Sequence, residues 1–89
     1  MAVVVNKIAS TVGKAMGDIL SRRPLDNDED FFLSGGDSLR AVELISRLAE
    51  RYSDGDADRS ADLGSALLIA VFDDATPLAL SAVVRNHLG

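Results

Sequence analysis

One serine in this sequence is placed where its hydroxyl can serve as an attachment point. Ser38 follows the run FFLSGGD at residues 31–37 and directly precedes an amphipathic helical pattern. The two glycines permit tight backbone geometry and close approach of a large partner. Asp37 and Ser38 are both favourable N-cap residues. A phosphate ester on Ser38 would also suit a helix start, because exposed N–H groups and the positive end of the dipole favour an anion there.

Catalysis by Ser38 itself lacks a chemical partner. A nucleophilic serine needs a general base, and the only histidine is His87. Residues 36–39 spell GDSL, the motif of a class of serine hydrolases, whose base lies in an Asp-x-x-His pair. Here Val84 stands where that aspartate would be, and the chain is too short for the α/β fold of those enzymes. We therefore expect no catalytic residue and no enzyme activity, and a serine that is modified.

Two helices and a long loop are expected to position this serine. Apolar residues recur near a period of 3.6 over residues 3–20, which predicts a first helix. Pro24 ends any helix before it, so residues 21–37 should form a loop, with Phe31 or Phe32 reaching the core. The second helix should run from Ser38 to about residue 52. Its buried face would consist of Ala41, Leu44, Ile45 and Leu48.

The second half of the chain is expected to hold one short helix and one longer one. Residues 53–64 are polar and contain glycine, which predicts a mobile loop. Alternating acids at Asp54, Asp56 and Asp58 do not fit a calcium loop, because the glycine is misplaced and no closing glutamate follows. A short helix should span residues 65–72, and Thr76-Pro77 should start the last helix. The chain is thus all-α, with no metal site.

Length and composition narrow the class of protein. The 89 residues form one domain, 1–89, with a net charge of −5 and a pI near 4.6, which disfavours nucleic acid as a partner. There is no cysteine, so no disulfide can form and a reducing, cytoplasmic setting is expected. No apolar run is long enough to span a membrane, and residues 1–7 do not resemble a signal peptide. A monomer is the default expectation.

The stretch from Phe31 to Leu44, with Asp30 as its leading acid, resembles the signature of phosphopantetheine carrier proteins. It is most similar to peptidyl carrier (thiolation) domains of nonribosomal peptide synthesis, the pathway type of many antibiotics. The likeness extends to the long first loop and to residues 72–76. Family members usually carry a proline where Ala75 stands, and the loop at 53–64 is longer than usual.

The resemblance implies a small four-helix bundle of the acyl-carrier-protein type, with three longer helices and a short third helix. Ser38, beside Gly36 and Asp37, would be esterified by a phosphopantetheinyl transferase that uses coenzyme A. The resulting phosphoprotein would carry an aminoacyl, peptidyl or other acyl group as a thioester on 4'-phosphopantetheine. An adenylation enzyme would load it, and condensation or tailoring enzymes would receive the cargo. Met1 lies just before the first expected helix and the chain ends just after the last, which suggests a free-standing protein that acts in trans.

Partner enzymes of this family read the second helix, its preceding loop and the third helix. The corresponding residues here are Leu39, Val42, Glu43 and Ser46, joined by Leu67 or Leu68 on the third helix. Two alternatives stay open. One is a polyketide or fatty-acid type acyl carrier, which the acidic charge and the aspartate before the serine also resemble. The other is a helical interaction module without a prosthetic group.

Overall fold

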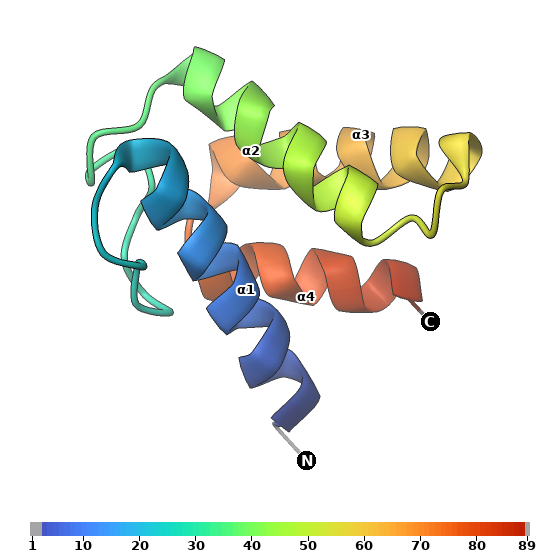
Figure 1. Cartoon of the computed structure of the whole chain (residues 1–89), viewed down its shortest axis with the longest axis horizontal. Coiled ribbons are helices and arrows are strands. Elements are labelled where there is room, and N and C mark those ends of the chain that lie inside the picture. The colour runs from blue at the N-terminus through green and yellow to red at the C-terminus, as the bar shows by residue number, and fades with distance from the viewer. Residues whose placement is uncertain (1–2, 89) are drawn as a thin grey trace.

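The computed structural model describes residues 3–88, with side chains from residue 7 onward, and shows four helices in this part of the chain. They are α1 (Val3–Leu20), α2 (Ser38–Arg51), α3 (Ala57–Asp73) and α4 (Pro77–Leu88). In Figure 1, α3 returns beside α2 in the opposite direction, and α1 crosses beside α4. The prediction of an all-α, four-helix bundle is confirmed. Residues 1, 2 and 89, which include the start at Met1, lie outside the described part.

Helix α1 has the predicted bounds and buries the middle of its apolar stripe. Ile8, Val12 and Met16 are buried at spacings of four, as one face of a helix requires. Gly13 and Gly17 lie on the side where the following loop crosses the helix. The Leu25 N–H donates to the Gly13 carbonyl at 3.1 Å, so the backbones of loop and helix are in direct contact.

The loop at residues 21–37 reaches the core at two points, as expected for its apolar end. Leu25 and Phe31 are buried, whereas Phe32 is half-buried. The carboxylate of Glu29 braces the loop: it accepts from the Asp26 N–H at 2.8 Å and pairs with Arg22 and Arg23 at 3.2 and 3.0 Å. The loop is therefore long but held at several points.

Helix α2 confirms the predicted amphipathic face, with Ala41, Leu44, Ile45 and Leu48 buried. It ends at Arg51, one residue before the predicted end. The side chain of Arg51 lies over the ring of Tyr52 at 5.9 Å, in cation–π geometry.

The third helix is not short, and the prediction of a mobile loop over residues 53–64 is wrong. Helix α3 begins at Ala57 and has 17 residues. The Asp56 carboxylate caps it by accepting from the N–H groups of Asp58 and Arg59 at 2.9 and 3.1 Å. Residues 57–62 are polar because they form the solvated first turns of an amphipathic helix, whose buried stripe starts at Leu63. Composition alone did not distinguish a polar helical turn from a loop.

Helix α4 starts as predicted. The Thr76 hydroxyl accepts from the Ala79 N–H at 3.2 Å, and Pro77 is the first helical residue. Leu80 and Val84 are buried and close the core against α1 and α3. No helix in the described part of the chain is long and apolar enough to cross a membrane.

Candidate functional site

Ser38 is the first residue of α2, and its hydroxyl is exposed. The capping role falls to Asp37, whose Oδ1 accepts from the Arg40 N–H at 2.8 Å. Its Oδ2 pairs with the Arg40 guanidinium at 3.1 Å. Among the described residues, no hydrogen bond engages the Ser38 hydroxyl. The structure thus separates the two N-cap candidates: Asp37 caps the helix, and Ser38 is its first residue.

The loop before Ser38 is fixed by a short chain of contacts. The Asp30 carboxylate accepts from the N–H groups of Phe32 and Leu33 at 2.8 and 3.1 Å. The Phe31 N–H donates to the Ala75 carbonyl at 3.0 Å, which ties the loop to the connection between α3 and α4. Phe31 is itself fully buried. The loop segment before Ser38 is therefore held in place by contacts with the core.

Each glycine in the motif has a distinct role. The Gly36 N–H donates to the Phe31 carbonyl at 3.0 Å, and a Cβ at Gly36 would lie 2.5 Å from the ring of Phe31. Only glycine allows this approach. Gly35 has a φ of 115°, a conformation that favours glycine, and its surroundings are open. Gly36 thus fixes the backbone of the loop and Asp37 caps α2.

This site fits a phosphate ester with a long arm. The N–H groups of Ser38 and Leu39 belong to the first turn of α2 and have no intrahelical acceptor, so they can face an anion. The nearby negative charge of Asp37 is offset by Arg40. A bound phosphopantetheine would supply a thiol, which the chain itself lacks.

Among the residues whose side chains are described, no hydrogen bond links Ser38 to His87 or to a carboxylate. The ring Nδ1 of His87 lies 3.3 Å from the Val83 carbonyl oxygen, near the end of α4. The only carboxylate next to Ser38 in sequence, Asp37, is occupied by the backbone and side chain of Arg40. In the described part of the chain, no three His, Asp or Glu side chains gather as a metal site would require.

Four of the five predicted interface residues lie on the exposed face of α2. Leu39 and Val42 are 80% and 51% exposed, and Glu43 and Ser46 are exposed beside them. Leu67 is fully buried, so its predicted place on the surface is wrong. It belongs to the i, i+4 stripe that packs α3 on the core.

Six large apolar side chains are exposed on the loop before Ser38, on α2 and on α3. These residues, here called the Ser38 patch, are Leu33, Leu39, Val42, Leu68, Ile69 and Phe72. Sequence reasoning did not single out Leu33, Ile69 and Phe72. Phe72 stacks on Phe32 with ring centroids 5.7 Å apart, which joins the loop to α3. Because α3 runs antiparallel beside α2, its C-terminal end lies near the start of α2 (Figure 1). A sequence prediction that gave α3 its full length would have placed Leu68, Ile69 and Phe72 on its exposed side.

The comparison with protein families agrees with this geometry. The family model described as "Phosphopantetheine attachment site" matches residues 6–55, more than half of the chain. The match covers most of α1, the loop and α2. The chain therefore belongs to the family of phosphopantetheine-bearing carrier proteins.

Membership defines the cofactor and the general role. Proteins of this family bear covalent 4'-phosphopantetheine, hold acyl groups on that arm and are generally noncatalytic. Carrier proteins of this family interact with phosphopantetheinyl transferases and with biosynthetic enzymes. No curated protein and no solved structure matches the chain.

Proposed function

We propose that Ser38 is the residue that receives phosphopantetheine. The observation that carries this proposal is the free, exposed hydroxyl at the first position of α2, inside the segment that the family model matches. In the transfer, the Ser38 oxygen attacks the phosphorus that bears pantetheine in coenzyme A. A new O–P bond forms, the bond to the adenosine bisphosphate breaks, and a base of the transferase takes the serine proton.

The motif supports a peptidyl carrier of nonribosomal peptide synthesis. The loop geometry uses both phenylalanines and both glycines of the signature, with Phe31 buried against Gly36. The cargo would be an aminoacyl or peptidyl thioester, loaded by an adenylation enzyme and passed to condensation or tailoring enzymes. The tethered arm raises the effective concentration of cargo at a docked partner. Residues 1–89 would act as one monomeric domain, in trans and in the reducing cytoplasm.

The acyl-carrier alternative rests on charge. The net charge is −5, and Asp37 precedes the serine. However, α2 has three arginines and two glutamates, so the acidity lies outside the helix that partners would read. The Ser38 patch supports docking through apolar contacts, which salt weakens little.

Intact mass spectrometry tests the attachment. The protein is incubated with coenzyme A and a broad-specificity phosphopantetheinyl transferase, beside Ser38→Ala and the matched control Ser10→Ala. Ser10 is also exposed on a helix, but it lies on α1, outside the expected partner interface. We expect one added group in the wild type and in Ser10→Ala, and none in Ser38→Ala. If none of the folded proteins gains the group, the proposal fails and a helical interaction module is the better interpretation.

A loading assay separates the two carrier types. The modified protein is offered amino acids with adenylation enzymes, or malonyl groups with an acyltransferase, each supplied as a separate protein. Aminoacyl thioester formation supports the peptidyl type acting in trans. Exclusive loading of malonyl groups would contradict it and support the acyl-carrier alternative.

A further inference from the structure

A cleft between α1 and α2, away from the Ser38 patch, gathers positive charge in an acidic protein. Its volume is about 420 Å³, within the usual range of ligand pockets. The residues that line it are Thr11, Lys14, Ala15 and Asp18 from α1, and Arg47, Leu48 and Arg51 from α2. Three cations and one carboxylate give the lining a net charge of +2, against −5 for the whole chain.

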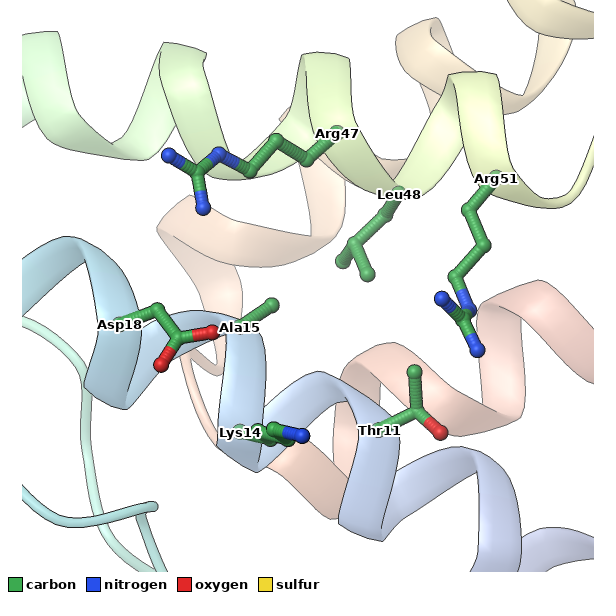
Figure 2. Close-up of a pocket in the computed structure, with 7 residues that line it drawn as sticks. All are labelled: Thr11, Lys14, Ala15, Asp18, Arg47, Leu48 and Arg51. Atoms are coloured by element: carbon green, nitrogen blue, oxygen red, sulfur yellow. The ribbon is translucent and has the colours of Figure 1, made fainter.

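The cations converge on the cleft from both helices. Figure 2 shows the side chain of Arg51 extending from α2 toward α1 and that of Arg47 running mainly along α2, with Lys14 on α1 across the cleft. In the chain as far as its side chains are described, no carboxylate lies within ion-pair distance of Lys14 or Arg51. Arg47 is held by Glu43 at 2.8 Å. Two of the three charges therefore have no internal counter-ion.

The walls favour carboxylates on aliphatic stems. Leu48 and Ala15 provide an apolar floor between the charged groups, and the Thr11 hydroxyl is occupied by its bond to the Lys7 carbonyl at 3.1 Å. The cleft lies along the sides of two helices, so no free backbone N–H faces it, as a phosphate cradle would require. Arginine forks match carboxylate geometry, and glutamate stems would pack on the floor.

A second cavity, of about 560 Å³, lies between α1 and the loop, on the other side of Lys14. Lys14 is the only cation in its lining, and Asp26 balances it. That cavity lacks the charge excess of the first. Of these two cavities, only the cleft between α1 and α2 has an excess of positive charge in its lining.

We propose that the cleft between α1 and α2 is a docking site for an acidic segment of a partner protein. It lies nine residues or more beyond Ser38 on α2, about 14 Å along the axis at 1.5 Å per residue. A partner could therefore occupy it while Ser38 stays accessible. The site does not depend on modification of Ser38 and can be tested on the unmodified protein.

Backbone amide NMR of the ¹⁵N-labelled protein tests the proposal. The probe is N-acetyl tetraglutamate amide, with its tetraglutamine counterpart as the uncharged control. We expect saturable shifts of amides at residues 11–18 and 47–51 with the glutamate peptide and none with the glutamine peptide. Binding should weaken as salt is raised, because the contacts are exposed ion pairs.

Two variants and a matched control locate the interaction. Lys14→Gln and Arg51→Gln should each weaken binding by about five-fold, the effect of roughly 1 kcal/mol. Arg59→Gln removes an exposed cation from α3, outside the cleft, and should change affinity less than about two-fold. Circular dichroism checks that each variant is folded. Equal loss in all three variants, or shifts that do not saturate, would overturn the proposal.

Inorganic phosphate is the third probe. The proposal expects phosphate to compete only weakly, because the cleft is suited to side-chain carboxylates. Saturation of the same amides by phosphate at concentrations as low as those of the peptide would show a simple anion site and would contradict docking of an acidic segment.

Discussion

Asp30 shows how one side chain prepares the Ser38 site from eight residues away. Its carboxylate fixes the N–H groups of Phe32 and Leu33, and this conformation sets the course of the chain toward Gly36. The same residue was recognised in the sequence only as the leading acid of a motif. Its physical role is local capping of the loop, which needs an oxygen acceptor and not a negative charge.

Two substitutions of Asp30 therefore distinguish the role of its oxygen as a hydrogen-bond acceptor from the role of its negative charge. Asp30→Ala should lower the free energy of unfolding by about 0.5–2 kcal/mol, because two N–H groups lose their acceptor. It should also slow phosphopantetheine transfer. Asp30→Asn retains the oxygen and should stay close to the wild type in urea unfolding and in transfer rate. An Asp30→Asn variant as damaged as Asp30→Ala would show that the charge is what matters.

Glu29 makes the same loop sensitive to acid. The hydrogen bond from the Asp26 N–H, together with the guanidinium groups of Arg23 and Arg22, holds the pKa of Glu29 below its ordinary value of 4.5. A lowered carboxylate pKa gives stability that is present above the unfolded-state pKa and lost as pH falls through the folded-state pKa. The loop should thus loosen in acid.

Urea unfolding of the wild type and Glu29→Gln between pH 7 and pH 3 measures this effect. We expect the wild type to be more stable at pH 7, and the difference between the two proteins to shrink as pH falls below about 4.5. A difference that stays constant over the whole range would show that ionisation of Glu29 does not stabilise the loop.

At the scale of elements, the contact between α1 and its following loop depends on glycine. A Cβ at Gly13 would collide with the Leu25 carbonyl oxygen, and one at Gly17 would lie 2.7 Å from the Arg23 carbonyl oxygen. Both obstacles are backbone atoms, which cannot turn away as a flexible side chain can. In contrast, a Cβ at Gly64 on α3 would meet its nearest atom, the Ala49 Cβ, at an ordinary 3.8 Å.

Gly13→Ala and Gly64→Ala should consequently have opposite effects on thermal stability. Gly13→Ala should cost about 1–3 kcal/mol, because the loop backbone must shift. Gly64→Ala should stabilise α3 by up to about 1 kcal/mol, because alanine is the better helix former. Calorimetry of both variants and of the wild type measures the change in thermal stability. A stabilised Gly13→Ala would contradict the close packing of loop and helix.

The elements also show where sequence reasoning succeeds. Helices α1, α2 and α4 were predicted because their apolar spacing and start signals, such as Thr76-Pro77, are local. The start of α3 was missed because its first turns are polar and only Leu63 begins the buried stripe. At the site, the exposure of Ser38 was predictable from the motif. The burial of Leu67 and the apolar surface around Phe72 could not be predicted without the full length of α3.

At the scale of the whole molecule, modification and folding are separable. The bundle measures 32 × 30 × 21 Å, and Ser38 lies at its edge where the loop meets α2. Its hydroxyl makes no contact on which the core depends. The Ser38 patch and the cationic cleft share no residue.

The central claim is that Ser38 carries the phosphopantetheine, and fragment-ion mass spectrometry of the transferase-treated protein tests it most directly. The measurement assigns the added group to a residue, with circular dichroism showing that Ser38→Ala keeps the helical fold. We predict a single modification on the peptide that contains Ser38, and none in Ser38→Ala. Modification of another serine, or of Ser38→Ala to the same extent as the wild type, would contradict the claim.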